Sequence, residues 1–127
     1  MTMMEVAKEL VAGCREDRAT ENLDRLYAPD AVSAEAFAMP GGEMPREVQG
    51  LDAIRGKHAW WNSTMDVLDA SVTEPMVHGD DRFAVIFKMK AREKASGNVM
   101  DMEEVGVYTV SNGKITREEF FYAMPDF

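Results

Sequence analysis

Two glutamates interrupt the apolar faces of expected β-strands. Glu35 shares its face with Ala31 and Phe37, and Glu104 follows Met102 on the same face of a later strand. Burial disfavours the charged form of a carboxyl group and raises its pKa. A carboxyl group tuned toward neutral pH can serve as a general base or a general acid. We therefore predict that Glu35 takes a proton from carbon or activates a water, and that Glu104 orients or protonates the substrate.

A third candidate is His58, which interrupts the apolar stripe of a helix expected over residues 51–63. Its ring could orient the substrate or act as the acid. The alternative for all these residues is structural, because ion pairs and twisted strand ends imitate functional sites. For Glu74, Glu118 and Glu119 the structural alternative is favoured, and we expect them at the surface or in an interface.

No motif in the sequence indicates a metal ion or a cofactor. The two histidines lack a short ligand spacing, and the single cysteine, Cys14, cannot form a multi-cysteine site or an internal disulfide. The Gly41-Gly42 pair lacks the strand, helix and Lys-Ser/Thr ending of a phosphate-binding loop. The chemistry expected of the carboxyl groups requires no cofactor.

The composition limits the classes of protein and partner. The chain has 127 residues, 46% of them hydrophobic, and a formal net charge of 14 − 23 = −9. These values predict one globular domain over residues 1–127 and exclude a disordered chain. The negative charge argues against a nucleic-acid or membrane partner. The single cysteine and the absence of a targeting segment predict a cytoplasmic location.

The first half of the chain has helical periodicity. Apolar spacing predicts a helix over residues 4–17, and a threonine N-cap begins a short helix over 20–28, which a following proline must end. An extended segment over 30–39 and a loop over 40–45 follow. The helix at 51–63 completes this half.

The second half alternates with a period of two. Strands are predicted over residues 67–78, 82–92, 99–110 and 115–122, with short turns between them. The Asn112-Gly113 pair is a strong hairpin signal. Short turns predict an antiparallel meander, and the three earlier helices can cover one of its faces. The expected fold is α+β, a roll in which a curved antiparallel sheet packs against three helices.

Three stretches carry a family resemblance that extends over nearly the whole chain. They are residues 26–32 (LYAPDAV), residues 49–55 (QGLDAIR), and residues 107–115 followed by 118–122 (VYTVSNGKI and EEFFY). In this order they resemble the nuclear transport factor 2-like superfamily, specifically its polyketide-cyclase-like (SnoaL-like) bacterial members. The resemblance implies a cystatin-like, cone-shaped fold whose helices pack on the concave face of the sheet.

The resemblance does not select one activity, because the superfamily includes isomerases, dehydratases, cyclases, hydrolases and non-catalytic modules. In its ketosteroid isomerase branch the general base corresponds to Glu35 of this sequence. The tyrosine that donates to the oxyanion in that branch corresponds to Val11, which cannot donate. The acidic partner falls near Gly106, with Glu104 nearby on the same face.

Two functional hypotheses follow. In the first, the chain holds a small apolar molecule between sheet and helices and acts as a cofactor-independent isomerase, lyase or hydrolase. The expected pocket residues are Phe37, Trp61, Phe87, Met89, Met102, Tyr108, Phe120 and Tyr122. In the second, the chain is a non-catalytic homodimer that associates through the outer sheet face, where Ile86, Val105 and Val107 lie.

Overall fold

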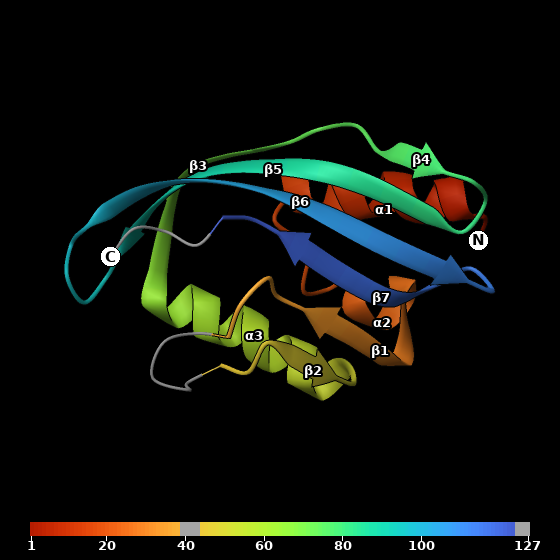
Figure 1. Ribbon diagram of the computed structural model, residues 1–127, viewed down its shortest axis with the longest axis horizontal. Helices are drawn as coiled ribbons and strands as arrows, with labels where there is room; N and C mark the ends of the chain where they lie inside the picture. Colours follow the sequence, from red (N-terminus) through yellow and green to blue (C-terminus); the bar gives the residue numbers. More distant parts are fainter. Residues whose placement is uncertain (39–43, 124–127) are drawn as a thin grey trace.

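The computed structural model describes residues 1–38 and 44–123. Within these residues, two helices precede two strands and a third helix in the first half, and strands follow one another in the second (Figure 1). The helices are α1 (Met3–Arg15), α2 (Leu23–Leu26) and α3 (Leu51–Thr64). The strands are β1 (Tyr27–Ala34), β2 (Glu47–Gln49), β3 (Met65–Val72), β4 (Met76–His78), β5 (Arg82–Glu93), β6 (Val99–Ser111) and β7 (Lys114–Phe121).

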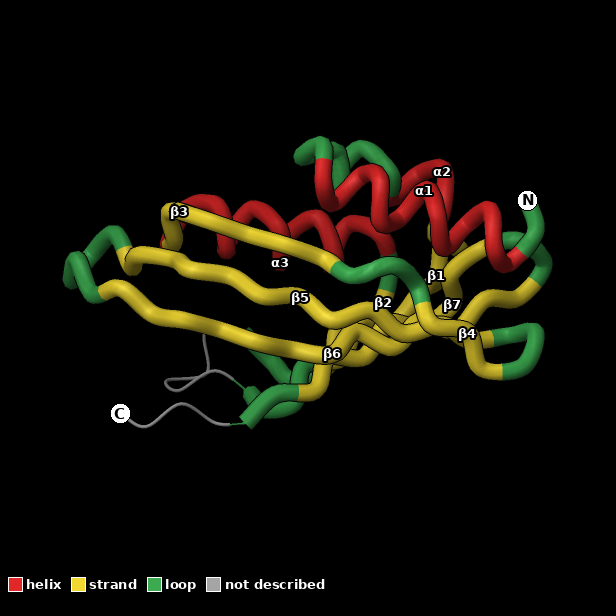
Figure 2. The backbone as a smooth tube through the Cα atoms, turned by 90° about the horizontal axis from the view of Figure 1, so that it is seen from above, coloured by secondary structure: helices red, strands yellow, loops and turns green. Residues whose placement is uncertain are grey.

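The strands form one curved sheet in the order β2-β1-β7-β6-β5-β3, with β4 paired to the other end of β5. The three helices lie along one side of the strands (Figure 2). This arrangement confirms the α+β roll. The sheet is mixed, however, because β1 and β7 pair in parallel. After β2, the chain crosses through α3 to β3 at the far edge of the sheet. The strands β5, β6 and β7 then lead back to β1, and β7 runs in the same direction as β1.

Two expected elements have different boundaries. The helix predicted over 20–28 is only one turn, and β1 begins at Tyr27 and includes Pro29. The proline is accommodated because the pairing of β1 with β7 shifts between Tyr27 and Val32. The strand predicted over 30–39 ends at Ala34 within the described part. Met39 and most of the predicted loop over 40–45 lie outside the described residues.

The strand predicted over 67–78 is two strands, β3 and β4. The interruption falls at Thr73–Pro75. There Thr73 accepts a hydrogen bond from the Ile86 backbone N–H through its side chain, and Pro75 has no N–H to offer the ladder. The short strand β2, which pairs with the end of β1, was not predicted because three residues carry too little periodicity.

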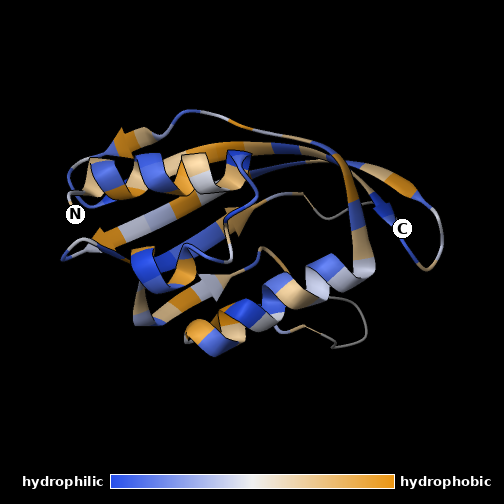
Figure 3. Ribbon diagram, turned by 180° about the vertical axis from the view of Figure 1, so that it is seen from behind, coloured by the Kyte–Doolittle hydropathy of each residue, from blue (hydrophilic) through white to orange (hydrophobic). Residues whose placement is uncertain are grey.

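Helix α1 covers the sheet with one apolar face. Thr2 and Glu5 form a capping box at its start. Val6, Leu10 and Val11 are buried, and the opposite face is polar, as the alternating colours in Figure 3 show. Among the described helices, none is both long and apolar enough to span a membrane.

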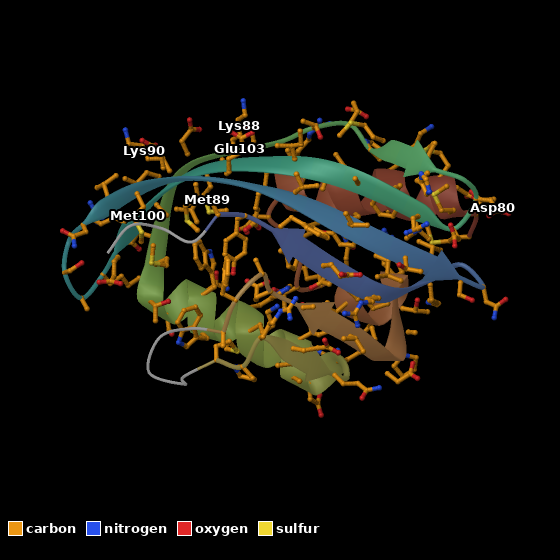
Figure 4. All side chains as sticks on the ribbon, in the orientation of Figure 1. Asp80, Lys88, Met89, Lys90, Met100 and Glu103 are labelled. Carbon is orange, nitrogen blue, oxygen red and sulfur yellow. The ribbon has the colours of Figure 1, made fainter. Side chains whose placement is uncertain are left out.

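The two faces of β5 and β6 differ in composition. On β5, Phe83 and Val85 are fully buried on the face toward the helices, which we call the inner face. Lys88 and Lys90 project from the other, outer face, on the side opposite to Met89 (Figure 4). Because Met89 pairs with Met102, and Phe87 with Glu104, the inner face of β6 carries Glu104 toward the helices.

Candidate functional site

A partly enclosed cavity of about 170 Å³ lies between the helices and the inner face of the sheet. Residues from α1, the turn after it, β1, α3, β5, β6 and β7 form its wall, so the fold brings together distant parts of the chain. The lining residues are Leu10, Ala19, Asn22, Tyr27, His58, Phe87, Met89, Glu104, Tyr108, Glu118 and Phe120.

Glu104 is an ionisable group of this wall whose pKa lies near neutral pH. Burial raises the pKa of its carboxyl group to about 7, and the negative charge of Glu35 acts in the same direction. The positive charge of Lys57 partly opposes both effects. Near neutral pH the carboxyl group is therefore present in both its protonated and its ionised form, as a general acid–base group requires.

A glycine allows Tyr108 to fold toward this glutamate. A Cβ atom at Gly106 would lie 3.0 Å from ring atoms of both Phe87 and Tyr108, and 3.3 Å from the Tyr108 hydroxyl oxygen. Only a residue without a side chain leaves this space for the Tyr108 ring, which extends back over Gly106 in the direction of Glu104. Burial raises the pKa of the Tyr108 phenol well above its usual value, so the hydroxyl group remains a neutral hydrogen-bond donor.

His58 and the turn after α1 close another side of the cavity. The Asn22 side chain donates to the Glu9 carbonyl and packs so closely on Gly13 that a Cβ there would lie 2.0 Å from its nitrogen. Thr20 Oγ1 and His58 Nδ1 are hydrogen-bonded at 2.8 Å. Burial lowers the pKa of His58, and the Lys57 charge lowers it further. The ring is therefore neutral at pH 7 and presents one donor and one acceptor nitrogen.

Glu118 anchors a buried hydrogen-bond network beside the cavity. The Tyr27 hydroxyl donates to one carboxyl oxygen, and Ser33 Oγ donates to the other at 2.6 Å. Lys57 Nζ donates to Ser33 Oγ at 2.7 Å and to Glu35 Oε2 at 3.2 Å. Burial raises the pKa of Glu118, while its bonds to Ser33 and Tyr27 oppose the rise. The network holds β1, α3 and β7 together at the base of the cavity.

Sequence comparison identifies the family of the chain. The SnoaL-like domain family matches residues 1–122. The chain belongs to this family. A protein from Mesorhizobium loti described as a SnoaL-like polyketide cyclase is 38% identical, with a TM-score of 0.86 over 96% of this chain and 100% of that one. No curated protein sequence matches this SnoaL-like chain significantly.

Two more distant structures share the fold of this SnoaL-like chain. TerC co-crystallised with polyporic acid is 22% identical, with a TM-score of 0.74 over 94% of this chain and 90% of that one. A protein from Catenulispora acidiphila with a ketosteroid isomerase-like fold, in complex with trimethylamine, is 14% identical, with a TM-score of 0.70 over 98% and 88% of the two chains. These likenesses confirm the expected fold.

The SnoaL-like cavity includes two of the three predicted catalytic residues, Glu104 and His58. Glu35 does not line it. This carboxylate follows the end of β1 and forms an ion pair with Lys57 at 3.2 Å, with 20% of its side chain exposed. Its negative charge nevertheless acts on Glu104. Glu35 therefore affects the pKa of a cavity residue without lining the cavity itself.

Four of the eight predicted pocket residues line the SnoaL-like cavity, namely Phe87, Met89, Tyr108 and Phe120. The other four, Phe37, Trp61, Met102 and Tyr122, are not part of its wall. Phe37 and Tyr122 contact each other edge-to-face, with ring centroids 6.2 Å apart. The wall also contains Leu10, Ala19, Asn22 and Tyr27, which were not predicted to line the pocket.

The expectation that Glu118 lies at the surface or in an interface is wrong, because only 3% of this residue is exposed. Its strand pairing explains why: Glu118 is opposite Tyr108, on the inner face. The sequence held a signal for this, since Glu118 alternates with Phe120, which was itself predicted to line the pocket. Glu74 is exposed and pairs with Arg15, and Glu119 is part-exposed and pairs with Arg117, as expected of surface charges.

Within residues 1–38 and 44–123, no group of three His, Cys, Asp or Glu side chains is arranged to hold a metal ion. Cys14 is half-buried, and burial raises the pKa of its thiol to about 11. The thiol therefore remains protonated and unreactive at neutral pH.

Proposed function

We propose that this SnoaL-like chain binds a small organic molecule in the cavity and transfers a proton on it, with Glu104 as the group that takes and returns the proton. The observation that carries the proposal is the position of the Glu104 carboxyl group, which lies in a largely apolar cavity wall where burial brings its pKa to about 7. Tyr108 and His58 supply hydrogen bonds in the same wall.

The proposed step removes a proton from a carbon next to a carbonyl group. The ionised Glu104 carboxylate takes the proton, and the C–H electron pair moves toward the carbonyl oxygen to give an enolate. The neutral Tyr108 hydroxyl or the His58 ring donates a hydrogen bond to that oxygen. The protonated Glu104 then returns the proton to the same or another carbon. Ring closure of the kind named for the Mesorhizobium loti relative can begin with the same proton removal.

Glu35, predicted as the proton acceptor, has a supporting role in this proposal. Its charge is the second cause of the raised Glu104 pKa, and its ion pair holds Lys57 beside Ser33. Glu35 thus keeps Glu104 partly protonated and pairs with Lys57, which is not itself a residue of the cavity wall.

Replacement of Glu104 by glutamine should slow proton exchange on a simple ketone by about 100-fold or more, because a general base contributes about that much. The probe is 4-hydroxycyclohexanone in D₂O, a one-ring ketone with a hydroxyl group, with loss of its α-proton signal followed by ¹H NMR. The matched control is Glu103→Gln, one residue earlier on the exposed outer face, which should exchange at the wild-type rate. Equal exchange rates for wild type and Glu104→Gln would contradict the role of Glu104. A wild-type rate no higher than that of buffer would contradict the catalytic proposal and support a non-catalytic binding protein.

We also propose that two copies associate through the outer face of the sheet. Ile86, Val105 and Phe121 form one apolar row across β5, β6 and β7, and Met76, Ala84 and Val107 form the next. Phe121 is 54% exposed and Met76 is 48% exposed, although both are apolar. Charges of both signs flank the rows, with Lys88 and Glu103 directly opposite each other. A second copy turned by a twofold axis would meet apolar rows with apolar rows and opposite charges at the edge.

The mass in solution tests this association. Light scattering at micromolar concentration should give about 28 kDa, twice the chain mass of 14.2 kDa. Val105→Glu, in the middle of the outer face, should halve that mass. Leu68→Glu, at an exposed site on the edge strand β3, should not. A wild-type mass of one chain would exclude the proposed dimer.

A further inference from the structure

The cavity is small. Its volume of about 170 Å³ is close to the ~150 Å³ of an engineered apolar cavity that binds benzene. One six-membered ring with one or two substituent atoms fills such a space. A molecule of several fused rings could enter only with most of its surface outside the wall.

The composition of the wall favours an apolar ring and disfavours an anionic ligand. Leu10, Phe87, Met89 and Phe120 supply apolar and aromatic surface. The acidic groups of the wall are the carboxyl groups of Glu104 and Glu118, and among the described residues no lysine or arginine lines the cavity.

Lys57, whose positive charge acts on Glu104, does not line the cavity and is engaged by other groups. Lys57 Nζ contacts Ser33 Oγ at 2.7 Å and Glu35 Oε2 at 3.2 Å, and it lies 5.4 Å from the centre of the Phe120 ring. A carboxylate or phosphate entering the cavity would therefore meet the carboxyl groups of Glu104 and Glu118 while the Lys57 charge is already paired with Glu35, and this disfavours its binding.

The carboxyl groups of the wall require a hydrogen-bond donor on the ligand, in addition to any acceptor that pairs with Tyr108 or His58. An ionised Glu104 only accepts, and both oxygens of Glu118 accept from Tyr27 and Ser33. A hydroxyl or amino group on the ligand would satisfy the Glu104 oxygens, which otherwise lose water when an apolar ring fills the space.

We propose that the ligand is an uncharged or cationic molecule of a single ring that carries a hydroxyl or amino donor, and that the cavity excludes anions and multi-ring compounds. This assignment rests on the cavity of the proposed function, but not on proton transfer. It narrows the broad range of ligands of the fold to the chemical class that the size and charge of this particular wall can hold.

A matched set of one-ring probes tests the assignment on the full chain. Phenol, benzylamine, toluene and benzoate have similar size and differ in charge and donors, and 2-naphthol adds a ring. In ¹⁵N NMR titrations, phenol and benzylamine should shift signals of cavity residues. Benzoate, toluene and 2-naphthol should bind at least about tenfold more weakly.

Three variants locate the site and the cause of the selectivity. Ala19→Trp, at the exposed end of the wall, should abolish binding of phenol by filling the cavity. Glu104→Gln should reduce the preference for benzylamine over benzoate at pH 8, and the outer-face control Glu103→Gln should retain it.

Several results would overturn the assignment. They are benzoate, toluene or 2-naphthol binding as tightly as phenol, shifts on the outer face instead of the cavity, or no binding of either donor probe at about 10 mM. The expected binding pattern together with a failed exchange of 4-hydroxycyclohexanone would support the ligand class and reject the proton transfer, so the two proposals can fail separately.

Discussion

Replacing Glu118 with leucine should lower the free energy of unfolding by about 3 kcal/mol or more. The reason is the network that the carboxylate completes. Without it, the buried hydroxyl groups of Tyr27 and Ser33 lose their acceptor, and each unsatisfied polar group costs about 1–3 kcal/mol. The loss of the carboxylate also removes the group that Ser33 joins to Lys57.

Urea unfolding followed by circular dichroism measures this change. The control is Glu119→Leu, the next residue, whose ion pair with Arg117 is partly exposed and should contribute less than about 1 kcal/mol. Adding Tyr27→Phe and Ser33→Ala to Glu118→Leu should recover part of the loss, because no hydroxyl group then remains without a partner. Equal losses for Glu118→Leu and Glu119→Leu would show that the network does not stabilise the fold.

Replacing Glu104 with glutamine should stabilise the protein at alkaline pH by up to about 3 kcal/mol and leave its stability almost unchanged below pH 4.5. The carboxyl group has a pKa of about 7 in the folded chain, against 4.5 as its ordinary value. Between these values the folded state holds a proton that the unfolded state has released. The free energy of unfolding of the wild type therefore falls as the pH rises from 4.5 to 7. Above pH 7 this group causes no further decrease.

The difference between the two proteins isolates this group, because the other titrating residues are common to both. Unfolding is measured at pH 4, 6 and 8, with Glu103→Gln as the control that should follow wild type throughout. A Glu104→Gln difference that does not change with pH would mean that the carboxyl group titrates alike in the folded and unfolded chains.

Much of the fold could be predicted because its elements are long and regular. The periodicity over Arg82–Glu93 and Val99–Ser111 lasts through enough residues to fix both the strands and their faces. The parallel pairing of β1 with β7 could not be read this way, because it depends on how the chain returns after α3. The helix predicted over 20–28 is longer than the observed helix Leu23–Leu26. Tyr27, which the prediction placed in the helix, instead pairs with Ile115 in the sheet, so tertiary pairing overrides the local helical preference.

The site was predictable where a single strand determined the direction of a side chain. Glu104 could be assigned to the inner face because Met102 and Tyr108 alternate with it along one strand. The strand register and the burial pattern of β6 confirm this assignment. The burial of Glu118 was not predicted, because Glu118 and Glu119 are identical neighbours whose side chains point to opposite faces of the strand. Only the pairing with Tyr108 shows which of them enters the core. The Lys57–Ser33 contact joins residues 24 positions apart, and no local pattern contains it.

The titration of Glu104 itself is the most direct measurement of the central claim, that a buried carboxyl group of this cavity can exchange a proton near neutral pH. The side-chain carboxyl carbon can be followed by ¹³C NMR from pH 3 to pH 9 and assigned by its loss in Glu104→Gln. We predict a midpoint of about 7. A midpoint near the ordinary value of 4.5 would show that burial does not tune this group, and would contradict its proposed role.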